Sequence, residues 1–92
     1  MPKHGMRNFI VVIDRNRKRI IEVLLMPEED QLSKKILRKL NSKLFVNHKK
    51  LTKKFPFPTY AVILGRAKDL DTIKLSFHEN WDKTRIKNIS AK

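Results

Sequence analysis

The stretch NFIVVIDRNRKRIIEVLLM, residues 8–26, decides the fold class of this chain. Two runs rich in β-branched and apolar residues, 8–14 and 19–26, flank the four polar residues 15–18, a pattern that is typical of a β-hairpin. Neither run alternates cleanly between apolar and polar residues. Such strands are central in a sheet or covered on both faces. The sequence therefore predicts a sheet built around this hairpin.

The segment after the hairpin predicts one long amphipathic helix over about residues 28–44. Pro27 suits the first turn of a helix, and the acidic residues 28–30 complement the positive end of the helix dipole. Apolar residues then recur at helical spacing and define one face: Leu32, Ile36, Leu37, Leu40 and Leu44. Cationic residues take the opposite face, with one more at the edge of the apolar stripe: Lys34, Lys35, Arg38, Lys39 and, at the edge, Lys43.

The second half of the chain predicts a loop and two further strands. Residues 45–58 are interpreted as a loop because the FPFP sequence at their end excludes a helix there. Residues 59–65 are apolar and predict a third strand. Residues 72–78 alternate between apolar and polar and predict a fourth. An alternative stays open for this last segment, since four apolar residues also form one helical stripe: Leu70, Ile73, Phe77 and Trp81.

These elements predict a single α+β domain in the order β-β-α-β-β. An antiparallel sheet with the long helix packed on one face would bury both apolar sets. Residues 1–7 are interpreted as a loose leader. The polar tail 79–92 is interpreted as a short C-terminal helix or as frayed chain, above all over 83–92. A chain of 92 residues has room for one such domain.

The sequence shows no membrane or secretion signal. No segment approaches the roughly 18 apolar residues of a membrane span. The first apolar run is too short for the core of a signal peptide. Cysteine is absent, which excludes disulfides and thiolate metal ligands and fits a reducing compartment. We therefore expect a cytoplasmic, intracellular protein that does not contact a membrane.

Positive charge is the outlier of the composition. The chain has 22 Lys and Arg against 9 Asp and Glu, a formal net charge of +13. A small soluble domain typically carries a net charge of about 2–8 in magnitude. Between Gln31 and Lys68 the sequence contains eleven Lys and Arg and no acidic residue, so the charge is concentrated and not scattered. A polyanionic partner would relieve the self-repulsion that this tract causes.

Phosphate is the natural ligand for such a tract, and the sequence predicts a nucleic-acid-binding protein. Lysine outnumbers arginine, and lysine acts as a mobile point charge, so contact with the phosphate backbone is favoured over base readout. DNA and RNA stay open as partners. The predicted phosphate ligands are Lys34, Lys35, Arg38, Lys39, Lys49, Lys50, Lys53 and Lys54. A second, smaller cluster marks the hairpin tip: Arg15, Arg17, Lys18 and Arg19.

Aromatic residues lie next to the basic loop. Phe55, Phe57 and Tyr60 follow Lys53 and Lys54, and exposed rings there would form a platform for base stacking. The alternative is that Phe55 and Phe57 pin the loop onto the core. Trp81 is the only tryptophan and is interpreted as a plug of the core or as an exposed contact for a partner.

Catalysis is not favoured, and no catalytic residue, metal site or cofactor is predicted. His78 and Asp82 have a spacing that could ligate a metal ion on a helix, but they would diverge at the end of a strand. Two other functions remain as alternatives. One is a small regulator or inhibitor that docks on an acidic protein, and the other is a small metal-dependent nuclease. A homodimer that covers the sheet edges is a further hypothesis.

Overall fold

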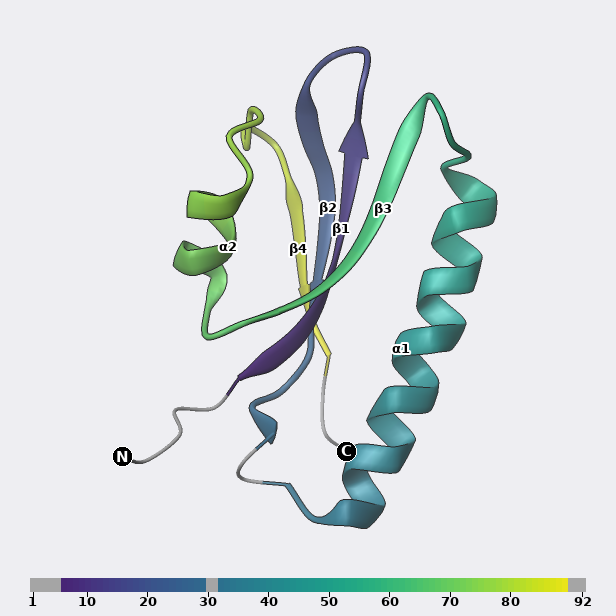
Figure 1. The fold of residues 1–92 in the computed structure, drawn as a ribbon, viewed down its shortest axis with the longest axis vertical. Coiled ribbons are helices and arrows are strands. Elements are labelled where there is room, and N and C mark those ends of the chain that lie inside the picture. The colour runs from purple at the N-terminus through teal and green to yellow at the C-terminus, as the bar shows by residue number, and fades with distance from the viewer. Residues whose placement is uncertain (1–5, 30–31, 90–92) are drawn as a thin grey trace.

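The structure is a computed structural model of the chain and describes residues 6–29 and 32–89. A four-stranded sheet carries one helix on each face (Figure 1), which confirms the predicted α+β class with a long helix on the sheet. The elements in chain order are β1 (Arg7–Asp14), β2 (Arg19–Leu25), α1 (Lys34–Lys54), β3 (Tyr60–Ala67), α2 (Leu70–Ser76) and β4 (Arg85–Asn88).

The sheet has the strand order β3-β1-β2-β4. β1 pairs antiparallel with β2 and with β3, and the predicted hairpin is confirmed. β2 and β4 pair in parallel, so the sheet is mixed, and the prediction of a wholly antiparallel sheet is wrong at this edge. After β3 the chain passes through α2 and reaches the opposite edge of the sheet, which is why β4 has the same direction as β2.

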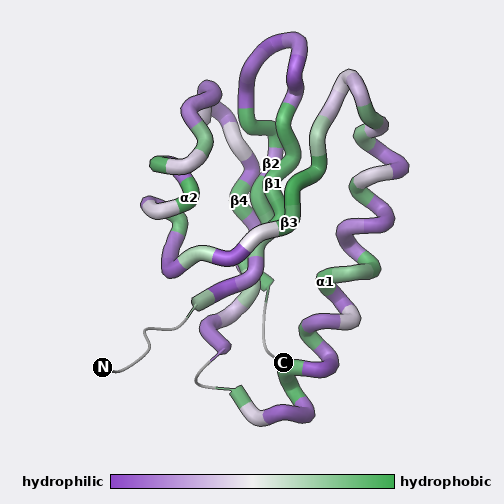
Figure 2. The backbone as a smooth tube through the Cα atoms, viewed as in Figure 1, coloured by the Kyte–Doolittle hydropathy of each residue, from purple (hydrophilic) through white to green (hydrophobic). Residues whose placement is uncertain are grey.

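Apolar layers cover both faces of the hairpin strands. Phe9, Val11 and Ile13 of β1 pack in the layer beneath α2, and Ile10 and Val12 pack in the layer beneath α1. Figure 2 shows the resulting hydrophobic centre of the sheet and the hydrophilic tip of the hairpin. Burial on both faces explains why β1 and β2 do not alternate in sequence.

α1 begins at Lys34 and not near residue 28. Ser33 caps the helix, since its side chain accepts a hydrogen bond from the backbone N–H of Ile36 at 3.3 Å. Glu28 and Glu29 precede α1 and are not part of its first turn. Each instead pairs with an arginine of the sheet, Glu28 with Arg7 at 3.1 Å and Glu29 with Arg66 at 3.0 Å. Glu28 and Glu29, which the sequence predicted to stabilise the helix dipole, therefore form ion pairs with the sheet instead.

α1 continues to Lys54, so the predicted loop is wrong for residues 45–54. Leu51 is buried, and it lies about two turns after Leu44, so the apolar stripe extends further than the sequence interpretation assumed. The helix ends before Pro56, which disfavours helical backbone at the residue before it. The four lysines assigned to the loop are consequently helical: Lys49, Lys50, Lys53 and Lys54.

The segment predicted as the fourth strand is helix α2, and the alternative helical stripe is the correct one. Asp69 caps α2 and accepts a hydrogen bond from the backbone N–H of Thr72 at 2.9 Å. Ile73 is buried against the sheet, with partly buried neighbours Leu70, Phe77 and Trp81. Leu75 points away and is 75% exposed. Packing on the uncovered face of the sheet therefore outweighs the alternating pattern.

The region predicted as a C-terminal helix or frayed tail contains β4. The backbone N–H of Ile89 donates to the carbonyl of Leu25 at 2.9 Å, and the hydroxyl of Thr84 donates to the carbonyl of Ile20 at 2.8 Å. Parts of three predicted segments lie outside the described residues, namely 1–5 of the leader, 30–31 of the helix and 90–92 of the tail. In the described ranges, no helix has the length and apolar character needed to cross a membrane.

Candidate nucleic-acid interface

The charged side chains on the exposed side of α1 are all cationic. Its 21 residues contain no acid, and every one of its lysines and arginines is exposed. Within the described part of the chain, ion pairs involve Arg7, Arg66 and Lys87 but no cation of α1. These cations are Lys34, Lys35, Arg38, Lys39, Lys43, Lys49, Lys50, Lys53 and Lys54.

The placement of these charges opposes the stability of α1. Lys34 and Lys35 occupy the first turn, at the positive end of the helix dipole, where a cation is unfavourable. Lys35, Lys39 and Lys43 follow one another at spacings of four, and like charges at this spacing repel. Only Lys53 and Lys54, in the last turn, complement the dipole. A helix with this charge pattern gains stability when an anion binds along it.

The basic cluster of the hairpin tip divides between the two faces of the sheet. Arg17 and Arg19 line a concavity on the α1 face, whereas Arg15 and Lys18 line a groove on the α2 face. Arg15 also has local partners, because its Nη1 donates to the carbonyl of Pro58 at 3.0 Å. The predicted cluster is therefore not one site, and its two faces have different neighbours.

The concavity on the α1 face brings together cations from three parts of the chain. It has a volume of about 440 Å³ and lies where the hairpin tip, the end of α1 and the start of β4 meet. Its cations are Arg17, Arg19, Lys54, Lys83 and Arg85. Its other walls are Asp14, Ile21, Glu22, Phe55 and Tyr60. We call this site, together with the cations of α1, the basic surface.

Sequence reasoning missed Lys83 and Arg85. Both lie in the polar tail, about 30 residues after Lys54, and only the parallel pairing of β4 with β2 places them beside the hairpin. Lys87 follows in the same strand, and its Nζ lies 3.8 Å from Oε1 of the buried Glu22. The alternation of cationic and other residues in RIKN, residues 85–88, was the only sign of a strand in the tail. Nothing in the sequence indicated that this strand lies near α1.

The two phenylalanines of the FPFP sequence have different surroundings. Phe55 is partly buried, packs on the α1 layer and contacts Tyr60 edge to face, with ring centroids 5.1 Å apart. Phe57 is 76% exposed, and the guanidinium of Arg15 lies 5.0 Å from its ring centroid. Phe55 thus anchors the end of α1, and only Phe57 presents its ring to solvent.

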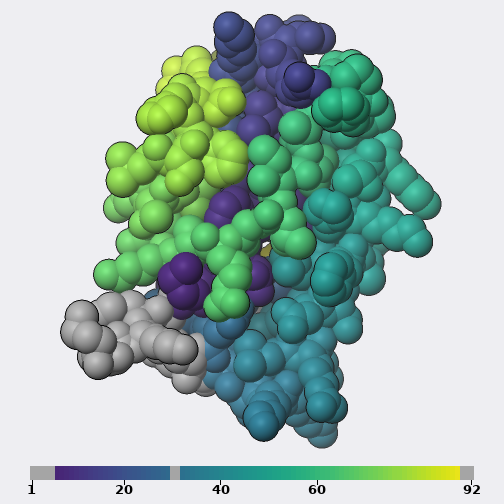
Figure 3. Space-filling view, viewed as in Figure 1, coloured from purple at the N-terminus to yellow at the C-terminus, as the bar shows by residue number. Residues whose placement is uncertain are grey.

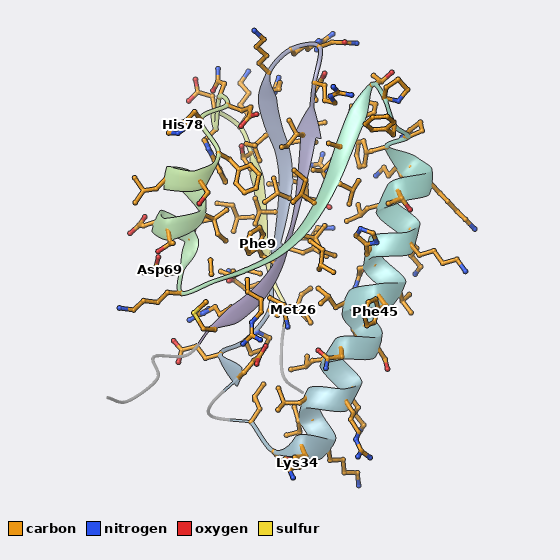
Figure 4. The ribbon with its side chains drawn as sticks, in the orientation of Figure 1. Phe9, Met26, Lys34, Phe45, Asp69 and His78 are labelled. Carbon is orange, nitrogen blue, oxygen red and sulfur yellow. The ribbon has the colours of Figure 1, made fainter. Side chains whose placement is uncertain are left out.

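The segment around His78 does not form a helical ligand pair. α2 ends at Ser76, so His78 and Asp82 are not on one helix (Figure 4 labels His78 beyond the end of α2). Hydrogen bonds from the side chain and backbone of Thr72 hold the pKa of Asp69 below its ordinary value of 3.8, as suits a helix cap. Among the described residues, no three or more His, Asp or Glu side chains cluster where they could hold a metal ion.

Trp81 packs against the core beneath α2. Its indole N–H donates to the carbonyl of Phe77 at 2.9 Å, and the Nζ of Lys74 lies 5.7 Å from its ring centroid. Of the two interpretations of Trp81, this placement fits the core plug.

Comparison of the chain with models of protein families, with characterised proteins and with solved structures found no match.

Proposed function

We propose that the protein binds nucleic acid through its basic surface, by contact with the phosphate backbone. The observation that carries the proposal is the exposed side of α1, which presents nine cations and no acid and has no ion pair to a described residue. The cations of such a surface repel one another, and a bound polyanion would lower this electrostatic repulsion. The cations of the concavity extend the same surface toward the hairpin tip.

The dimensions of α1 suit an extended partner. A helix of 21 residues is about 31 Å long at 1.5 Å per residue, which is comparable to nine base pairs of duplex. Lysine provides most of the charge along it, and lysine lacks the bidentate geometry that reads a guanine or a phosphate in one orientation. The surface therefore supports binding with weak dependence on base sequence.

Salt dependence is the first test of this proposal. Binding to duplex DNA, single-stranded DNA and structured RNA is measured by fluorescence anisotropy over a range of NaCl concentrations. If about five phosphates are contacted, log K falls against log salt with a slope of about −4.5 for a duplex, a loss of about 500-fold between 50 and 200 mM. Which polymer binds most tightly then identifies the partner.

A pair of matched variants locates the contact. Lys35→Ala with Lys39→Ala removes two charges from α1, and Lys68→Ala with Lys74→Ala removes two charges outside the basic surface. We expect the α1 variant to weaken duplex binding by about one order of magnitude and to make the salt slope less steep by about 1.8. The control variant should bind nearly as the wild type does.

Two outcomes would contradict the proposal. Equal losses in the two variants would show that net charge matters and the position of the charge does not. The second outcome is that none of the three polymers binds at low salt, while an acidic protein is captured in stoichiometric amount and stays bound after nuclease treatment. This result would assign the basic surface to a protein partner instead.

A further inference from the structure

β3 is an end strand of the sheet, and none of the described residues pairs with its outer edge. The backbone N–H of Arg15 donates to the carbonyl of Thr59 at 3.0 Å, and this bond continues the register of β1 with β3. Because hydrogen-bonded pairs alternate along an antiparallel ladder, the odd-numbered residues of β3 bond to β1 and the even-numbered residues face outward. Val62, Leu64 and Arg66 therefore direct their N–H and C=O groups away from the sheet.

This edge lacks the devices that normally protect an edge strand. Natural edges are short, kinked, covered or charged, and lysine or proline is common on them. β3 has eight residues, no proline and no lysine, and its register with β1 is continuous. Its one charged residue, Arg66, is neutralised by Glu29 at 3.0 Å. Figure 3 shows the strand at the surface between α1 and α2.

Exposed apolar side chains border the edge on the α1 side. Leu64 is 40% exposed and lies on the α1 side of β3, as Val62 does. Phe45 is 64% exposed and lies midway along α1 (Figure 4). It is on the side of the helix that faces the same way as the free edge of β3. Helical spacing places the neutral residues Asn41, His48 and Thr52 in line with Phe45. Toward the start of α1 the same line continues to Arg38 and Lys34.

On the α2 side, a groove of about 640 Å³ runs along β3. Its floor is formed by Ile13, Ala61, Ile63 and Phe77, and Arg15, Lys18 and Glu79 lie at its end near the hairpin tip. Ala61 and Ile63 are only partly buried, because the seven-residue helix α2 covers part of this face. Partly exposed apolar side chains therefore border the free backbone on both sides.

The opposite edge of the sheet has the reverse character. β4 has four residues, all exposed, and two of them are cations, Arg85 and Lys87. The chain as a whole has a net charge of +13, so two copies repel each other at almost any contact. On β3 itself a second copy would meet no unpaired cation, because the one charged residue of the strand, Arg66, is bound to Glu29. An acidic partner would instead be drawn to the basic surface.

We propose that the β3 edge is a homodimer interface, in which two copies pair antiparallel about a two-fold axis at Leu64. In this register Leu64 lies opposite Leu64 of the second copy, and Val62 lies opposite Arg66 of the second copy. The outward N–H and C=O groups of all three residues then form hydrogen bonds between the copies. The axis is perpendicular to the sheet, since opposite residues in a ladder point to the same face. The dimer has one eight-stranded sheet with both α1 helices on the same face.

Matched substitutions on the two edges test this interface. Leu64 and Ile86 are both 40% exposed, one on β3 and one on β4, so Leu64→Lys and Ile86→Lys add the same charge at the two edges. Mass is measured by light scattering and sedimentation equilibrium in the absence of nucleic acid, which keeps the result independent of the proposed function. We expect a dimer for the wild type and Ile86→Lys, and at least tenfold weaker association for Leu64→Lys.

The absence of native cysteine allows a direct measurement of the register. Residues that face each other in a hydrogen-bonded pair have Cα atoms about 5.5 Å apart, within the range of a disulfide. Leu64→Cys should therefore form a symmetric disulfide dimer under mild oxidation, and Ile86→Cys should not. A monomeric wild type at all concentrations tested would overturn the proposal. So would a dimer that Leu64→Lys leaves intact, or a foreign peptide bound along β3 of a monomer.

Discussion

Gly65 allows β3 to pass closely over the ring of Phe9. A Cβ at position 65 would lie 2.7 Å from Cζ of Phe9, closer than real side chains approach. The ring cannot move away easily, because Phe9 is buried and packs edge to face against Phe77 at 6.3 Å. The glycine is thus required by contact across the sheet and not by a special backbone angle.

We predict that Gly65→Ala destabilises the protein by about 1–3 kcal/mol, as overpacking of a core does. Urea unfolding followed by circular dichroism measures the change. Ala61→Ser, on the same strand and face, provides a control for substitution as such. In a double-mutant cycle, Phe9→Leu should remove most of the added cost of the alanine, because the smaller side chain leaves room for the Cβ. Fully additive effects would contradict the contact.

At the scale of the element, α1 packs on the sheet and also carries the cations proposed to bind nucleic acid, and these cations lower its stability. The buried stripe holds the helix to the sheet, whereas the exposed cations repel one another. Lys39 is central to this conflict, since Lys35 and Lys43 lie one turn before and one turn after it. A substitution at this position separates the contribution of charge to stability from its contribution to binding.

Lys39→Glu should stabilise the protein and weaken nucleic-acid binding. The change converts two repulsive pairs into attractive ones, a gain on the order of 1 kcal/mol in the free energy of unfolding at low salt. The same change adds a negative charge to the basic surface, so affinity for duplex DNA should fall. Lys39→Ala should give intermediate values in both measurements. A loss of stability in Lys39→Glu would mean that Lys39 has a structural contact that outweighs the repulsion.

The whole molecule is electrostatically asymmetric. Cations gather on α1, the hairpin tip and β4, whereas the acids Glu28 and Glu29 neutralise arginines of β1 and β3. The two edges of one sheet therefore differ, with a neutral β3 edge and a basic β4 edge. This separation would let one edge carry protein contacts while the basic surface stays free for a polyanion.

Screening of the net charge should stabilise the whole fold. Raising NaCl from about 0.05 to about 0.5 M shortens the Debye length to a few ångströms, which weakens the repulsion among exposed cations. We expect the melting temperature to rise by several degrees, as calorimetry can show. Lys39→Glu should show a smaller rise, because part of its repulsion is already removed. A melting temperature that falls with salt would indicate that the ion pairs of Glu22, Glu28 and Glu29 contribute more than the cation repulsion does.

Local patterns predicted much of the fold and the position of the charge. The hairpin, the third strand and the amphipathic character of α1 follow from residues that are neighbours in sequence, because strand and helix periodicities are local properties. The cationic side of the first half of α1, from Lys34 to Lys43, follows from the same periodicity, whereas residues 49–54 were predicted as a loop. The sequence by itself thus determined that a basic helix face lies opposite an apolar one.

Only the tertiary structure decided which of the open alternatives holds. Residues 70–76 fit a strand or a helix, and the face of the sheet that α1 leaves uncovered selects the helix, since Ile73 must be buried there. The parallel pairing of β4 brings Lys83 and Arg85 to the hairpin tip. These outcomes depend on contacts between residues far apart in the chain, and no local periodicity encodes such contacts.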